Sequence, residues 1–179
     1  MTGKTHTVGG VALALTVTTL TGLYYPDGIN VSLATTGVYL ACAGTGALLP
    51  DIDTKRSTVS QEHKVVSFFS RLFLTHRGFT HSPLCLAILG IILYIAKTIL
   101  KMPFLDIVFT GFLLGYGSHI ILDSFNPKGV PLLYPSKKRF SFGNVKTSGF
   151  WENFVFFALT CVIAIEGYII VENLGLIQR

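Results

Sequence analysis

Five apolar runs of nearly membrane-spanning length constrain this chain more than any other feature of its sequence. A helix needs about 20 mostly apolar residues to cross the hydrocarbon core of a bilayer. The runs cover approximately residues 8–24, 29–49, 83–100, 104–122 and 150–171. Each is bounded by Pro, Gly, Asn or charged residues, and the first and third are short enough to require tilt or local thinning of the bilayer. The pattern predicts membrane-spanning helices.

The scarcity of charged residues supports this interpretation. Only 13% of the residues are charged, whereas an ordinary soluble domain has nearer a quarter. The net charge of +5 comes from Lys and Arg residues that lie in the gaps between the apolar runs, as membrane topology requires, which argues against nucleic acid as a partner. We predict an all-α membrane protein, a bundle of about five transmembrane helices that forms a single integral membrane domain over residues 1–179.

Two longer segments separate these helices. Between the second and third runs, apolar residues recur at helical spacing opposite a polar face, which predicts an interfacial helix on the cytoplasmic side. Its apolar face consists of Val65, Val66, Phe69, Leu72 and Phe73. The other segment, residues 124–149, is rich in Gly, Pro and Lys, and prolines keep residues 131–135 from forming an extended helix.

The distribution of basic residues predicts the orientation. In a five-span topology, 11 of the 14 Lys and Arg residues fall on the side of the amino terminus and the two long segments. The positive-inside rule therefore places the amino terminus in the cytoplasm. This orientation requires an odd number of spans and a first run that is retained as a helix. Retention is expected because residues 21–25 lack the small-residue cleavage site of a signal peptide.

The metal-ligating residue types gather at the ends of the predicted helices, all on the cytoplasmic side. His119 and Asp123 are four residues apart, so they share one helix face and can bind one ion. Asp51 and Asp53 place two carboxylates on the same side of an extended segment. The candidate ligands are His6, Asp51, Asp53, His76, His81, His119 and Asp123.

Imidazole together with carboxylate favours a divalent metal, Zn²⁺ or Mn²⁺, and seven candidates leave room for one or two ions. Any one of these residues alone would be read as an interfacial side chain in contact with water. Their joint placement at one face of so apolar a chain favours a metal site. His63 belongs to the predicted amphipathic helix and reads as a surface residue.

Neighbouring polar residues have two readings each. Glu152 is a further ligand or a catalytic general base, and His76 is a ligand or a catalytic proton shuttle. Arg77 holds an anionic substrate group or acts as a positive-inside anchor. Thr80 and Ser82 orient the histidines or cap the third apolar helix.

The combined motifs resemble a known family. They are His6 with Gly9-Gly10, the segments 49–53 (LPDID), 76–82 (HRGFTHS) and 119–123 (HIILD), and the segment 129–135 (GVPLLYP). Together, and in this order, they resemble the YdjM-type, LexA-regulated, membrane-bound metal-dependent hydrolases of bacteria. The resemblance covers the chain from His6 to about Pro135. It implies a multi-span protein of the bacterial inner membrane with a metal site, and it supplies no substrate.

The leading hypothesis is a metal-dependent hydrolase at the cytoplasmic face of the membrane. Its substrate would be a phospholipid or a lipid-linked ester or phosphoester, because the site lies at the depth of the lipid headgroups. One alternative is a transporter of metal ions or protons, which calls for ionisable residues at mid-span depth, where only Asp106 and Glu166 are candidates. The other is a non-catalytic membrane scaffold with a structural metal. Membrane lipid is the partner that all three share.

Overall fold

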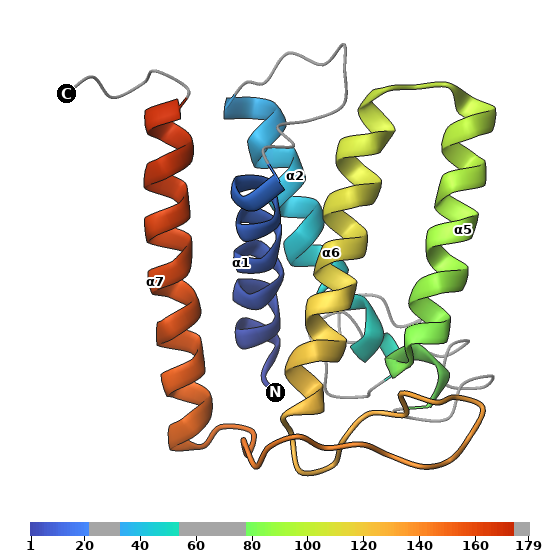
Figure 1. The fold of residues 1–179 in the computed structure, drawn as a ribbon, viewed down its shortest axis with the longest axis vertical. Coiled ribbons are helices and arrows are strands. Elements are labelled where there is room, and N and C mark those ends of the chain that lie inside the picture. The colour runs from blue at the N-terminus through green and yellow to red at the C-terminus, as the bar shows by residue number, and fades with distance from the viewer. Residues whose placement is uncertain (22–32, 54–77, 174–179) are drawn as a thin grey trace.

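The computed structural model describes residues 1–21, 33–53 and 78–173 of the chain. Within them, five α-helices run side by side with roughly parallel axes (Figure 1). These are α1 (Gly3–Thr21), α2 (Leu33–Gly46), α5 (Pro83–Leu100), α6 (Phe104–Ser124) and α7 (Phe150–Asn173). Two short 3-10 helices, η1 (Leu49–Asp53) and η2 (Phe79–His81), contact each other at the end of the bundle where α2 finishes and α5 starts.

Four helical segments in the described part of the chain are long and apolar enough to cross a membrane. They are Leu33–Asp51, Pro83–Leu100, Phe104–Ser124 and Phe150–Glu172. The prediction of an all-α membrane bundle is thereby confirmed. The remaining helix, α1, is less apolar because it is rich in Thr and Gly, and it contacts α2, α6 and α7. Eight of its nineteen residues are buried, so much of its polarity faces protein.

Helix α1 begins earlier than its apolar run. The run was expected to start at Val8, whereas the helix starts at Gly3. Thr2 explains the early start, because its hydroxyl accepts a hydrogen bond from the backbone N–H of Thr5 and its carbonyl accepts one from His6. His6 is therefore a residue of the first helical turn rather than of the preceding segment, and its orientation is fixed by the helix.

Small residues bring α1, α2 and α6 close together. A Cβ added at Gly10 of α1 would lie 2.6 Å from the carbonyl oxygen of Ala43 in α2, and one added at Gly115 of α6 would collide with the same oxygen. The hydroxyl of Tyr39 in α2 also donates to the carbonyl of Ala14 in α1. Close backbone approach through Gly and Ala is the usual way in which membrane helices gain packing contacts. These three helices form the centre of the bundle.

Helices α5 and α7 flank this centre and keep their apolar side chains exposed. No residue of α5 is buried, and Ile91, Tyr94 and Ile99 are among its exposed side chains. In α7, Phe157 and Ile165 are more than 60% exposed. An exposed apolar surface of this extent suits the hydrocarbon of a bilayer rather than water. A Lys97–Asp106 ion pair joins α5 to α6 at the end of the bundle remote from η1 and η2.

The segment between α6 and α7 forms an ordered connection along one end of the bundle (Figure 1). Val130 and Phe140 pair as an isolated antiparallel bridge, and residues 131–135 form turns rather than a helix, as the prolines predicted. The predicted interfacial helix, with His63, lies outside the described residues and stays a prediction.

Candidate metal centre

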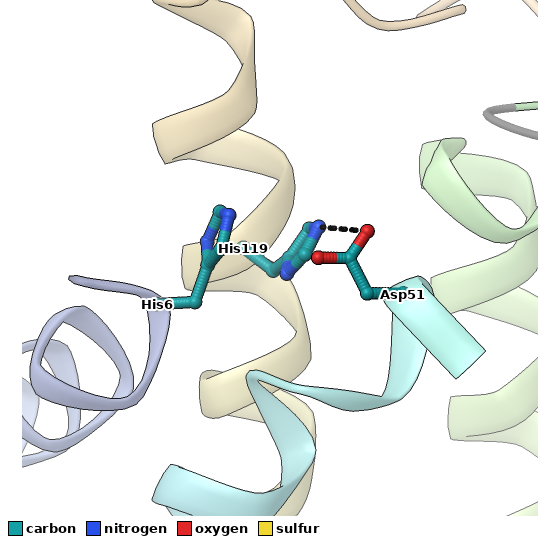
Figure 2. A group of neighbouring side chains, drawn as sticks. All are labelled: His6, Asp51 and His119. Atoms are coloured by element: carbon teal, nitrogen blue, oxygen red, sulfur yellow. Dashed lines mark ion pairs between the residues drawn. The ribbon is translucent and has the colours of Figure 1, made fainter. Parts of the chain in front are cut away.

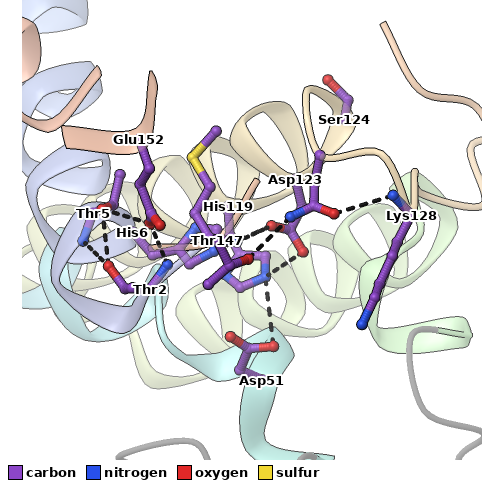
Figure 3. Close-up of polar contacts among 12 residues, drawn as sticks. Thr2, Thr5, His6, Asp51, His119, Asp123, Ser124, Lys128, Thr147 and Glu152 are labelled. Carbon is purple, nitrogen blue, oxygen red and sulfur yellow. Dashed lines mark hydrogen bonds and ion pairs between the residues drawn. The ribbon is translucent and has the colours of Figure 1, made fainter. Parts of the chain in front are cut away.

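Five side chains of metal-ligating types, from four segments of the chain, converge at the end of the bundle that holds η1 and η2. Figure 2 shows His6, Asp51 and His119, and Figure 3 adds Asp123. They are His6 of α1, Asp51 of η1, His81 of η2, and His119 and Asp123 of α6. The side chains of all but Asp51 are fully buried, and that of Asp51 is 18% exposed. Burial of so many polar groups is costly unless they bind one another or an ion.

Local structure explains how each segment delivers its ligand. His119 and Asp123 lie one turn apart on α6, with Nε2 and Oδ2 separated by 3.8 Å. Helix α2 ends at Gly46, and after a short turn the helix η1 brings Asp51 toward α6. His81 closes η2 immediately before Ser82, whose hydroxyl accepts from the backbone N–H of Cys85 and so caps α5. The sequence-based reading of Ser82 as a helix cap is observed in the structure.

Neighbouring donor atoms in the cluster lie at separations close to those of two ligands on one cation. Two donors bonded to the same ion at about 2.1 Å are roughly 3.4 Å apart at the tetrahedral angle and about 4.2 Å apart when opposite. The observed separations are 3.3 Å for His81 Nε2 and His119 Nε2, 3.4 Å for His81 Nε2 and Asp51 Oδ1, 4.0 Å for His119 Nε2 and Asp51 Oδ1, 3.9 Å for His81 Nε2 and Asp123 Oδ2, and 3.3 Å for His6 Nε2 and Asp123 Oδ1. Three lie within this range, and the two at 3.3 Å lie 0.1 Å below it.

Contacts behind the histidines orient their Nε2 atoms toward one another. The Nδ1–H of His119 donates to the carbonyl oxygen of Ala47 at 2.7 Å. His81 Nδ1 shares a hydrogen bond with Thr80 Oγ1 at 3.1 Å, and Tyr116 OH donates to the carbonyl of Thr80 at 2.5 Å. Hydrogen bonds of this kind fix which ring nitrogen faces a metal. The predicted orienting role of Thr80 agrees with this geometry.

His6 completes the cluster from the side of α1. Its ring stacks on that of His119, with centroids 3.7 Å apart. Neither ring nitrogen of His6 makes a hydrogen bond to any described residue, although Nε2 faces Asp123. A fully buried imidazole whose nitrogens lack hydrogen-bond partners, next to a buried carboxylate, is typical of a metal-binding site. The residues therefore fit the divalent metal that the sequence predicts.

Positive charge is already present at this carboxylate. The amino group of Met1 donates to Asp123 Oδ1 at 2.6 Å, and both groups are buried. A carboxylate in this setting needs a cationic neighbour because burial of an isolated charge is strongly unfavourable.

The structure places Glu152 beside the cluster but engages it elsewhere. One carboxylate oxygen accepts from the backbone N–H of Thr2 at 2.5 Å and from the hydroxyl of Thr5 at 2.9 Å (Figure 3). The other accepts from the backbone N–H of Ser148. Its predicted role as a ligand or general base stays a prediction, and the observed contacts join the start of α7 to the start of α1.

Three other predicted site residues cannot be placed. His76 and Arg77 lie outside the described residues, and for Asp53 only the backbone is described. Conversely, sequence reasoning missed Tyr116 and the carbonyl of Ala47. Tyr116 carries a weak signal, since it lies three residues before His119 on the same helix. A backbone carbonyl carries none.

Comparison with known proteins gives a consistent family. The YdjM inner membrane protein family matches residues 1–177. "Uncharacterized protein YvsG" of Bacillus subtilis (strain 168) is 32% identical over 161 residues, which cover 89% of this chain and 90% of that protein. "Inner membrane protein YdjM" of Escherichia coli (strain K12) and its counterpart in Shigella flexneri are each 41% identical over 97 residues, or 52% of this chain and 47% of theirs. No solved structure matches. The predicted family is confirmed, and a membrane location with it: the chain belongs to the YdjM inner membrane protein family.

Proposed function

We propose that this protein is a metal-dependent hydrolase of the bacterial inner membrane that acts at the cytoplasmic face. The observation that carries the proposal is the cluster of three histidines and two aspartates, whose donor atoms form two overlapping groups close enough to hold a metal ion. Zn²⁺ or Mn²⁺ suits this mixture of nitrogen and oxygen ligands. The five donors form two overlapping groups, His6 with Asp51 and His119, and His81 with His119 and Asp123, so they suit one ion or two. His76 and Asp53 are further candidate ligands.

The five ligands divide into a rigid set and an accessible one. His6, His81, His119 and Asp123 are fully buried and held by helices or by hydrogen bonds behind their rings. Asp51 is the partly exposed ligand, so substrate and water reach the centre from its side. A bound divalent ion supplies Lewis acidity for an ester or phosphoryl oxygen and makes water a better nucleophile. The protein contributes ligand geometry and exclusion of water on the buried side.

A lipid or lipid-linked ester or phosphoester is the proposed substrate class. The cluster lies at one end of helices whose outer surfaces are apolar, which is the depth at which headgroups meet the hydrocarbon. If Arg77 lies near the ion, its guanidinium would bind an anionic group of such a substrate. A cytoplasmic position for this end follows from the positive-inside rule.

Metal content tests the proposal directly. Detergent-purified protein is expected to hold one or two equivalents of Zn or Mn by plasma mass spectrometry, and His119→Ala and Asp123→Asn are expected to lose metal. Asp106→Asn is the matched control, because it removes a carboxylate from the opposite end of the same helix. A well-folded wild type that stays metal-free after incubation with Zn²⁺ and Mn²⁺ would contradict the proposal.

Measurement of enzymatic turnover distinguishes a hydrolase from the two alternatives, a transporter and a scaffold with a structural metal. The metal-loaded protein is expected to release fatty acid or phosphate from phospholipid, lysophospholipid or lipid-phosphate vesicles, and Asp123→Asn is expected to abolish release while the fold is retained. Loss of folding in the same variant, with no activity in the wild type, would indicate a structural metal. Uptake of metal ions or protons into sealed vesicles without hydrolysis would indicate a transporter.

A further inference from the structure

The segment 125–149 is fastened to the end of α6 directly after the ligand Asp123. The backbone N–H of Phe142 donates to the carbonyl of Ser124 at 2.8 Å, and that of Val145 donates to the carbonyl of Phe125 at 3.0 Å. The hydroxyl of Ser141 donates to the carbonyl of Asn126 at 2.9 Å. The segment therefore doubles back along the α6 terminus rather than extending away from the bundle.

Apolar contacts hold residues 130–134 of the same segment against α5, α6 and η2. Val130 is fully buried in a cluster with Tyr116 and Ile120 of α6, and Leu132 packs against that cluster. Tyr134 lies against the ring of Phe79 in η2, with centroids 5.5 Å apart. The segment therefore covers the end of the bundle that holds the candidate metal site (Figure 1).

The outer surface of segment 125–149 is strongly basic. Residues 125–149 include five basic residues and no acidic residue. All five basic side chains are exposed, and they are Lys128, Lys137, Lys138, Arg139 and Lys146. None of them makes a salt bridge to a described residue. Among the described residues, the ammonium of Lys138 lies 5.3 Å from the centroid of the Phe140 ring. The charges are therefore available to an external anion.

Large apolar side chains are exposed among these charges. Leu133 is 62% exposed and Phe142 is 64% exposed, and the adjoining first residues of α7, Phe150 and Trp151, are 77% and 62% exposed. Basic residues interspersed with exposed aromatic and aliphatic side chains are typical of surfaces that lie in the headgroup region of an anionic membrane.

We propose that residues 125–149 form a binding surface for anionic phospholipid headgroups, with the basic side chains on the phosphates and Leu133 and Phe142 inserted between the lipids. The occupant is a bilayer lipid because the apolar side chains flank the charges at the depth where α7 enters the membrane. Binding of a soluble anion would not require these exposed apolar side chains. The inference does not depend on hydrolase activity, and it would hold for a transporter or a scaffold as well.

Trp151 provides the probe, since it is the only tryptophan of the chain and lies at this surface. The full-length protein is reconstituted into phosphatidylcholine vesicles that contain increasing fractions of brominated phosphatidylglycerol or brominated phosphatidylcholine, and quenching of Trp151 is measured. Quenching by the anionic lipid is expected at a several-fold lower mole fraction, because each basic residue near the surface contributes about a five-fold preference. The preference is expected to decline with salt.

Two charge-matched variants decide whether this surface is responsible. Lys137→Gln/Arg139→Gln removes two exposed charges from the segment, and Lys97→Gln/Lys101→Gln removes two from the opposite end of the bundle. The first is expected to lose most of the preference and the second to keep it. Lys128→Gln/Lys146→Gln repeats the test if the first variant folds poorly. Equal quenching by the two lipids in the wild type, a preference that survives both segment variants, or an equal loss in the remote variant would overturn the proposal.

Discussion

Glu152 links two helices through hydrogen bonds rather than through packing. Its carboxylate accepts from the N–H of Thr2, the hydroxyl of Thr5 and the N–H of Ser148, and it is 2% exposed. Thr2 and Thr5 belong to the turn that carries His6. The carboxylate therefore holds one candidate metal ligand, His6, in position through the backbone of α1, as groups behind a ligand do in metal centres.

Replacement of Glu152 by Ala is expected to destabilise the fold by about 1–3 kcal/mol, because one buried and two partly buried donors lose their acceptor. Metal affinity is expected to fall by roughly tenfold, since His6 is no longer held in place. Zn²⁺ titration against a competing chelator and thermal unfolding in detergent measure the two effects.

Glu152→Gln distinguishes positioning from catalysis. The amide keeps one oxygen acceptor, so the positioning role predicts affinity and turnover between those of wild type and of the Ala variant. If Glu152 is instead the general base, as the sequence first suggested, the Gln variant would bind metal normally and show no turnover.

The sequence predicted those site residues whose role depends on the side chain, and it missed contacts made by the backbone. The types and spacings of His6, Asp51, His81, His119 and Asp123 pointed to one face, and the structure brings these five together. The orienting contact of His119 uses the carbonyl of Ala47, which every residue type possesses, so no sequence pattern marks it.

Among the elements, the approach of α6 to α2 depends on glycine. Gly115 lies against the carbonyl of Ala43, four residues before the carbonyl that holds His119. Any side chain at this position must push the two helices apart.

Gly115→Ala is therefore expected to destabilise the bundle by about 1–3 kcal/mol and to weaken metal binding, because the shift separates His119 from Ala47. Gly167→Ala in α7 is the matched control. A Cβ there meets no atom within 4 Å, and Ala favours the helix by about 0.5–1 kcal/mol. Thermal unfolding in one detergent compares the pair, and equal stability of the two variants would contradict the close-packing interpretation.

The helices themselves were predicted well where apolar runs end at Pro, Gly or charge. The start of α5 at Pro83 and of α7 at Phe150 agree with the runs. The start of α1 was missed, since the first turn is polar and is stabilised by the Thr2 cap and by contacts with α7 that become visible only in three dimensions. Local hydropathy does not contain that information.

At the scale of the whole molecule, the candidate metal centre joins segments that are distant along the chain. Its ligands come from α1, η1, η2 and α6, so one ion would cross-link most of the bundle. Chelation is therefore expected to lower the stability of the entire fold, by about 2.7 kcal/mol relative to protein with free metal at 100 times its dissociation constant. Thermal unfolding with and without chelator measures the effect, and His119→Ala should be insensitive to chelator. Equal sensitivity of that variant would mean that the ion acts elsewhere.

The hydrogen bonds of Glu152 also have a consequence for biogenesis. All five clustered ligands precede α7 in the chain, so a nascent protein that ends before Phe150 already has them. The hydrogen bonds that fix the turn carrying His6 form only after Glu152 has been synthesised. If the cluster binds a metal ion, completion of the site is expected to depend on insertion of the last helix, and a chain that stops before α7 is expected to retain the metal poorly even with all five candidate ligands present.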